Sequence, residues 1–341
     1  MAGGLLERLE QGPVVCAEGY LFELERRGYV QAGPFVPEVV LDHPEVVAQL
    51  HRDFVHAGSD VVEAFTYYGH REKMRIIGKE QLLEALNRQA LEIAKEVASE
   101  TDALLAGDIS NTNVYAEDEE SKRTVREMFA EQVAWAADAA VDYVIAETFS
   151  HVGEALLALE TIKEADLPAV VTMTLHRHPT TRDGLTPEEA CRQLEAAGAD
   201  VVGLNCSRGP ATMLPAIRAI REAVSGHVAA LPVPYRTSDE QPTFQSMRDP
   251  AHPDEMAFPT ALDGLMCTRY EIAGFAHQAH ALGVDYLGLC CGAGPHHVRS
   301  LAEAIGRTPP ASRYSPDMSK HAYFGTDETL KPENVEFAKD L

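Results

Sequence analysis

The sequence predicts an α/β protein, a single (β/α)8 TIM barrel, and three observations lead to that prediction. Short apolar runs rich in β-branched residues alternate with amphipathic runs along the whole chain. The apolar runs are continuous rather than alternating, as in parallel strands that are buried on both faces. There are eight such strand–helix units, and many of the strands end in a cysteine or a polar residue, where a barrel gathers its catalytic groups.

The elements follow from these patterns in chain order. The expected strands are Val14–Glu18, Val61–Phe65, Ala103–Asp108, Tyr143–Glu147, Ala169–Leu175, Val201–Cys206, His227–Val233 and Tyr286–Cys291. The expected helices span residues 45–57, 79–100, 119–140, 151–165, 186–198, 210–224, 269–283 and 295–306. The run 187–198 is typical of them, with an acidic first turn, an apolar stripe and a final glycine. An open doubly wound sheet shares this alternation, and the count of eight favours the barrel.

Three connections that follow strands are long, at residues 19–44, 66–78 and 234–268. They are expected on the catalytic face, because long loops in a compact domain are usually functional. A mobile surface insertion is the alternative for the last of them. Residues 1–308 are expected to form the barrel. Residues 309–341 show no clear periodicity and are expected to form an irregular C-terminal tail packed on it.

Composition excludes several classes of protein. The chain has 341 residues, and its 53 acidic against 29 basic side chains give a net charge of −24. This argues against nucleic acid or an anionic membrane as partner. No stretch of about 18 apolar residues is present, and the first residues lack the apolar core of a signal peptide. Six cysteines in such a chain indicate a reducing compartment, so we expect a cytoplasmic protein.

Three cysteines stand at the carboxyl ends of two expected strands. Cys206 ends one strand, and Cys290 and Cys291 end another, just before a glycine-rich turn. Neighbouring strand residues point to opposite faces, so both thiols reach one ion only if the chain turns there. Three thiolates from two strand ends suit zinc and leave a fourth position for a substrate. A strained vicinal disulfide is the alternative. The remaining cysteines are expected to be small buried hydrophobes: Cys16, Cys191 and Cys267.

These cysteine segments resemble a known family. Leu289-Cys290-Cys291-Gly292, then Pro295-His296-His297, together with Gly203-Leu204-Asn205-Cys206, is similar to the zinc-binding pattern of the homocysteine S-methyltransferases. Further segments particularly resemble the betaine–homocysteine S-methyltransferases: residues 27–30, 32–34, 65–68, 145–147 and 268–272. The resemblance implies a (β/α)8 barrel that holds one zinc ion on Cys206, Cys290 and Cys291.

The resemblance also implies the reaction. Homocysteine would present its sulfur at the open zinc position as a thiolate and accept a methyl group from an onium donor, giving methionine. Glycine betaine is favoured as donor, and the alternatives are proline betaine, S-methylmethionine or a dimethylsulfonio acid. A zinc-binding or thiol-binding protein without turnover is a second class. A cobalamin-linked module would need a corrinoid domain. The oligomeric state is left open.

Two carboxylates are candidates for the homocysteine ammonium group. Glu147 and Glu18 both end strands on the face of the cysteines, and a structural salt bridge is the alternative for each. Family members commonly have an Asp-Gly-Gly turn after the first strand, where this chain has Ala17-Glu18-Gly19. Either Glu18 supplies a carboxylate one carbon longer, or Ala17 occupies the aspartate position. Glu147 is therefore the better candidate.

Aromatic residues are candidates for binding the donor. Phe35, Tyr67 and Tyr68 follow the first two strands, and aromatic faces attract quaternary ammonium groups. The betaine enzymes have tryptophan where this chain has Phe35, a weaker partner that leaves room for another onium donor. Ordinary loop packing is the alternative. Arg208, Arg236 and His176 also follow strands and are candidates for the donor carboxylate, among which the sequence does not choose. Asp108 ends a strand too, and a capping role is expected for it.

Overall fold

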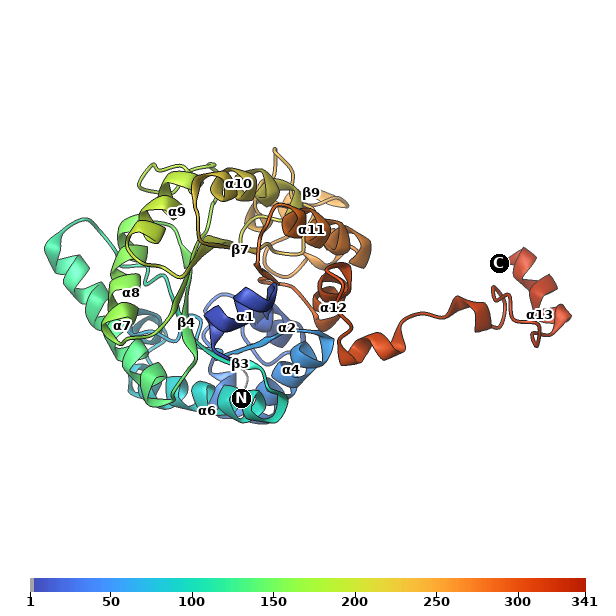
Figure 1. Ribbon diagram of the computed structural model, residues 1–341, viewed down its shortest axis with the longest axis horizontal. Helices are drawn as coiled ribbons and strands as arrows, with labels where there is room; N and C mark the ends of the chain where they lie inside the picture. The colour runs from blue at the N-terminus through green and yellow to red at the C-terminus, as the bar shows by residue number, and fades with distance from the viewer. Residues whose placement is uncertain (1–2) are drawn as a thin grey trace.

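The computed structural model describes residues 3–341, and its core is one curled sheet of eight parallel strands surrounded by helices (Figure 1). The strands are β1 (Val14–Ala17), β2 (Val61–Glu63), β3 (Leu104–Ser110), β4 (Tyr143–Phe149), β5 (Ala169–Met173), β6 (Val201–Asn205), β7 (His227–Leu231) and β10 (Tyr286–Leu289). Their order in the sheet is β1-β10-β7-β6-β5-β4-β3-β2. The predicted (β/α)8 barrel is confirmed, and each expected strand is present.

The barrel closes between β1 and β2 through Asp60. Its N–H group donates to the carbonyl of Val15 at 2.7 Å, and its carboxylate accepts from the N–H of Val15 at 2.7 Å. The carbonyl of Asp60 accepts from Leu104 at 2.8 Å, at the start of β3. Arg307 also donates to the Asp60 carboxylate, so the chain beyond the last barrel helix is tied to this corner.

Eight helices cover the outside of the sheet where the sequence predicts them. They are α4 (Pro44–Ala57), α6 (Leu83–Thr101), α7 (Glu119–Asp138), α8 (Val152–Glu164), α9 (Pro187–Ala196), α10 (Pro210–Ala223), α11 (Arg269–Ala281) and α12 (Pro295–Ala304). The start of α9 shows why such boundaries can be read locally, because Thr186 and Glu189 form a capping box there. Within residues 3–341, no helix combines the length and apolarity needed to cross a membrane.

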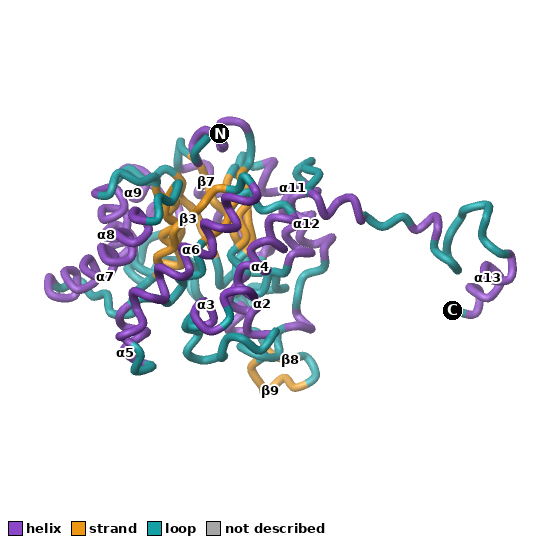
Figure 2. Tube along the Cα trace, turned by 90° about the horizontal axis from the view of Figure 1, so that it is seen from below, coloured by secondary structure: helices purple, strands orange, loops and turns teal. Residues whose placement is uncertain are grey.

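Several short elements were not anticipated. Helix α1 (Leu5–Gln11) precedes β1, and its Leu5 and Leu9 pack against residues at the amino ends of the strands, closing that end of the barrel. The long connections contain α2 (Tyr20–Arg26), α3 (Val39–Asp42), α5 (Arg71–Ile76) and the hairpin β8 (Arg248–Asp249) and β9 (His252–Met256). Figure 2 shows these elements at the barrel end opposite the N-terminus. Segments this short show too few repeats for periodicity to reveal them.

Residues 309–341 lie differently from a tail packed along its whole length. The first part contacts the barrel: Pro309 is buried, Ser312 donates to Glu303 at 2.7 Å, and Arg299 donates to Ser315 at 2.6 Å. The rest runs away from the barrel to α13 (Pro332–Phe337), as Figures 1 and 2 show. No side chain beyond Pro309 is buried, so the later part adds nothing to the hydrophobic core.

Candidate active site

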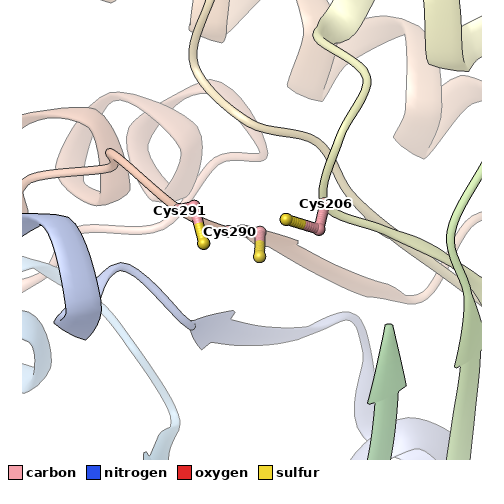
Figure 3. A group of neighbouring side chains, drawn as sticks. All are labelled: Cys206, Cys290 and Cys291. Atoms are coloured by element: carbon pink, nitrogen blue, oxygen red, sulfur yellow. The ribbon is translucent and has the colours of Figure 1, made fainter. Parts of the chain in front are cut away.

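Three thiols meet at the carboxyl ends of β6 and β10. Cys206 follows β6, Cys290 and Cys291 follow β10, and their side chains lie close together (Figure 3). The three Sγ atoms all lie within 4.8 Å of one another, and all three residues are buried. A tetrahedral zinc ion with Zn–S distances of about 2.3 Å needs its sulfur ligands roughly 3.8 Å apart. The cysteine geometry therefore fits this ion.

Unusual backbone conformations aim these side chains. Cys206 and Ser207 have φ angles of 55° and 53°, which turn the chain sharply at the end of β6. Gly292 has φ 92°, and a Cβ atom there would lie 2.2 Å from the hydroxyl of Tyr235. Among residues 3–341, nine non-glycine residues have positive φ, and six of them line the cavity beside the cysteines: Phe35, Tyr68, Asn113, Thr148, Cys206 and Ser207. Such strain concentrates at functional sites.

On the inner side of the cysteines lies a cavity of about 20 Å³, which we call the acidic pocket. Its walls include Cys290, Cys291 and four buried carboxyl groups, one from each of β1 to β4 or the residue that follows: Glu18, Glu63, Asp108 and Glu147. Oxygens of Glu63, Asp108 and Glu147 lie within 4.8 Å of one another. No lysine or arginine is among the described residues that line this pocket. Buried charges are normally paired, so the acidic pocket is suited to a cationic group.

Asn205 links the acidic pocket to the cysteines. Its Nδ2 donates to Glu18 at 3.2 Å and also to Glu147, while its Oδ1 accepts from the N–H of Thr148 at 3.0 Å. This residue stands directly before Cys206, so one strand end orients two carboxylates and supplies a thiol. Sequence reasoning did not assign Asn205 a role, although an amide at the end of an apolar strand is a usable signal.

The protonation of these carboxyl groups reflects their burial. Burial, followed by the nearby charge of Cys206, raises the pKa of Glu147 to about 8. Burial, followed by the charge of Glu147, raises the pKa of Glu18 and of Asp108 well above their ordinary values. Burial and then Glu18 do the same for Glu63. A bound ammonium group would favour the charged forms.

Hydrogen bonds among the three thiols shift their pKa values as well. Hydrogen bonds from Cys290 and Cys291 hold the pKa of Cys206 well below the usual value for a thiol. Burial raises the pKa of Cys290, and the hydrogen bond with Cys206 raises that of Cys291. One thiol of the three is thus prepared for the thiolate form that a metal ligand requires.

On the outer side of the cysteines lies a second cavity of about 430 Å³, which we call the outer cavity. Cys206 and Cys291 line it, together with an aromatic wall: Phe22, Phe35, Tyr67, Tyr68, Phe244 and Phe258. The rings of Phe22 and Phe35 lie 5.6 Å apart, and those of Tyr67 and Tyr68 lie 4.3 Å apart. The structure therefore brings all three predicted aromatics, Phe35, Tyr67 and Tyr68, to one cavity beside the thiols. Tyr67 lines the acidic pocket as well.

The other predicted residues fall into two groups. Glu18 and Glu147 line the acidic pocket. Gly19 lies so close to the loop after β10 that a Cβ atom would be 2.1 Å from the carbonyl of Ala293, which explains the glycine. The expected capping role of Asp108 is not observed, because its side chain faces the acidic pocket and its Oδ1 has no partner within the described residues. Sequence reasoning gave Glu63 no role, although it is the one acidic residue in the apolar run 61–65.

The candidates for the donor carboxylate differ in availability. The guanidinium of Arg208 donates to the carbonyls of Leu175, His176 and His178, at 3.2, 2.8 and 3.2 Å. Arg236 forms a two-bond ion pair with Glu271, both bonds at 2.7 Å. Of the three candidates, only the side chain of His176 lines the outer cavity.

Comparison with known proteins agrees with this geometry. The sequence profile described as Homocysteine S-methyltransferase matches residues 14–305. The chain belongs to the homocysteine S-methyltransferase family. The resemblance found in the sequence is thereby confirmed, and so is the expected enzyme class, an S-methyltransferase.

Individual members of this family that are similar to the chain include a betaine–homocysteine S-methyltransferase 1 from Xenopus tropicalis. It is 38% identical over 333 residues, which cover 95% of this chain and 80% of the relative. An S-methylmethionine–homocysteine S-methyltransferase from Pongo abelii is also 38% identical, over 96% of this chain and 88% of its own. Among solved structures, the metallated homocysteine methyltransferase MmuM from Escherichia coli has the same fold, with a TM-score of 0.68 at 18% identity, over 87% of this chain and 98% of its own.

Proposed function

We propose that this protein is a zinc-dependent S-methyltransferase that moves a methyl group from a betaine-type onium donor, with glycine betaine favoured, to homocysteine, giving methionine. One observation carries the proposal: three buried thiols lie beside an acidic pocket and an aromatic cavity, and Cys291 lines both. The ammonium group of an amino thiol suits the first chamber, which has room for one group of that size. An onium head suits the second, and both would reach the same sulfur cluster.

The residues divide the work as follows. Cys206, Cys290 and Cys291 would hold zinc, whose Lewis acidity makes a substrate thiol available as thiolate at neutral pH. Glu147 and Glu18, oriented by Asn205, hold the acceptor's ammonium group by charge-assisted hydrogen bonds. These contacts fix the acceptor sulfur at the boundary between the two chambers.

The donor is held from the other side. The faces of Phe35 and Tyr68 attract the onium head and replace its water. The acceptor sulfur then attacks a methyl carbon in line with the bond that breaks. The new bond joins sulfur and carbon, the electron pair of the old bond returns to the onium nitrogen or sulfur, and the demethylated donor leaves neutral at that atom.

The names of the relatives point to two classes of methyl donor. A relative named for betaine and one named for S-methylmethionine are equally identical to this chain, at 38%. A sulfonium donor or another betaine is therefore the second candidate, with the same chemistry. All six cysteines are free thiols, as this chemistry requires, and they are consistent with the cytoplasmic location that the sequence predicts.

A donor screen tests the proposal. The reduced, zinc-loaded protein is incubated with homocysteine and with glycine betaine, proline betaine, S-methylmethionine or dimethylsulfoniopropionate, and methionine is measured. Glycine betaine is expected to give the highest kcat/KM. If only a sulfonium donor gives methionine, the donor is a sulfonium compound and not glycine betaine. Homocysteine binding without methionine from any donor would instead indicate a thiol-binding protein.

A further inference from the structure

The outer cavity has a polar end beyond its aromatic wall, and the function proposed above gives that end no role. Arg182, His176, His151 and Ser150 line it, from the loop after β5 and the start of α8. A donor whose onium head lies against the aromatic wall would direct the rest of its molecule toward these residues. The charges and contacts here therefore bear on which donors the cavity accepts.

The backbone around Arg182 is held firmly in place. The N–H group of Arg182 donates to the carbonyl of Ser150 at 2.8 Å. The carboxylate of Asp183 accepts from Val152 at 2.7 Å and from Gly153 at 3.3 Å, at the beginning of α8. Through these bonds, the start of one barrel helix fixes the loop and sets the position from which the Arg182 side chain extends.

The side chain of Arg182 is exposed where it lines the cavity, and it is uncommitted. Within residues 3–341, its guanidinium makes no hydrogen bond and no ion pair, whereas those of Arg208 and Arg236 are occupied. The one buried acid at this end of the cavity, Glu154, accepts from the N–H and hydroxyl of Thr112 at 2.7 and 2.6 Å. An arginine fork with free donors in a cavity is suited to bind a carboxylate through two parallel bonds.

His176 places a hydrogen-bonding group beside Arg182. The Nε2 atom of His176 lies 2.8 Å from the hydroxyl of Ser150, which fixes the ring at the cavity wall. Burial lowers the pKa of His176, so near pH 7 its ring is neutral and offers a hydrogen bond rather than a charge. At this end Arg182 is the charged donor available to a carboxylate, because backbone and threonine donors already occupy Asp183 and Glu154, while the aromatic end favours a cation.

We propose that Arg182, supported by His176, binds the carboxylate of the methyl donor and restricts the donors to onium acids. The inference rests on the proposed function and specifies its substrate class. Arg182 is a specificity residue, since it contacts the far end of the donor and no reacting atom. Onium compounds without a carboxylate would use the aromatic wall alone and would bind more weakly.

Equilibrium binding separates this inference from turnover. The zinc-loaded protein, saturated with homocysteine, is titrated calorimetrically with glycine betaine, dimethylsulfoniopropionate and tetramethylammonium at conditions that permit no measurable methyl transfer. Arg182→Gln is expected to lower the affinity for glycine betaine and dimethylsulfoniopropionate by roughly ten- to a hundredfold, the usual contribution of a charge-assisted hydrogen bond. The affinity for tetramethylammonium should not change. Arg182→Lys is expected to recover part of the lost affinity.

The matched control is Arg177→Gln, which removes an exposed arginine of the same loop that does not line the cavity. It is expected to bind all three compounds as the parent protein does. Equal weakening of tetramethylammonium and the acids in Arg182→Gln would show that Arg182 only supports the cavity's shape, and unchanged binding of the acids would also overturn the inference. If no donor gives methionine in the screen, the proposed function is wrong. The binding titrations would still show whether Arg182 recognises a carboxylate, because they do not depend on methyl transfer.

Discussion

The acidic pocket and the outer cavity lie on two sides of the same three cysteines and are built in opposite ways. The acidic pocket, of about 20 Å³, takes its four carboxyl groups from positions on or directly after barrel strands. The outer cavity, of about 430 Å³, is formed by loops with strained backbone, aromatic walls and a basic end. The proposed acceptor site thus belongs to the rigid sheet, and the proposed donor site belongs to loops. Since loops tolerate change better than strands, donor choice can vary on a constant barrel.

The largest effect is expected at the three cysteines beside the two chambers. Cys206→Ala, Cys290→Ala and Cys291→Ala are each expected to abolish methionine formation and to lose the zinc ion, of which the parent protein should hold about one per chain. Metal analysis of the purified reduced proteins measures this. Cys191→Ala, which removes a buried cysteine in α9, is the control and should retain both. Full zinc occupancy in all three variants would refute the site assignment.

A smaller effect, confined to the acceptor, is expected in the acidic pocket. Glu147→Gln keeps the shape of the side chain but removes its charge, at a cost of about 1.5–3 kcal/mol in ammonium binding. The homocysteine KM should rise roughly ten- to a hundredfold, with the donor KM and the zinc content unchanged. Glu160→Gln, on the exposed face of α8, serves as control. An unchanged homocysteine KM would leave Glu18 as the ammonium partner.

In the outer cavity, a substitution is expected to affect the methyl donor and not homocysteine. Phe35→Ala removes an aromatic contact worth about 1–2 kcal/mol and should raise the donor KM roughly tenfold without changing the homocysteine KM. Phe35→Trp should maintain or improve the use of glycine betaine if the pocket is shaped for a trimethylammonium head. Steady-state kinetics with both substrates varied distinguishes these outcomes. Tyr270→Ala, which alters an aromatic that is 90% exposed, is the control. If Phe35→Ala affects no donor, Phe35 only packs the loop.

The smallest effect is one of stability. Burial raises the pKa of Glu147 from an unfolded value of about 4.3 to about 8, so the native state binds more protons than the unfolded chain between these values. Stability from this group is therefore complete below about pH 4 and falls as the pH rises toward 8. Glu63→Gln removes another carboxyl group whose pKa burial raises. In urea unfolding at pH 5.5 and 8 without substrates, this variant should lose less stability than the parent. An equal loss would show that the pKa of Glu63 is not raised in the native state.

Much of the fold and part of the site could be predicted from the sequence. The strands and barrel helices follow from local patterns, since a buried parallel strand is a continuous apolar run and a helix carries its own capping residues. The cysteine site was predictable for a related reason. Strand ends in a barrel converge on one face, so the positions of Cys206, Cys290 and Cys291 along the chain were enough to bring them together.

Only the tertiary structure decided which charged residues share a chamber. Glu63 and Asp108 join Glu18 and Glu147 because the register and curvature of the barrel turn all four inward, and no local pattern records that direction. The availability of Arg182 depends in the same way on distant groups. Three loop carbonyls occupy Arg208, Glu271 occupies Arg236, and the start of α8 fixes the loop of Arg182. Local sequence determines which strand, helix or loop carries a side chain. The partners of that side chain are determined by packing between segments that are remote in the chain.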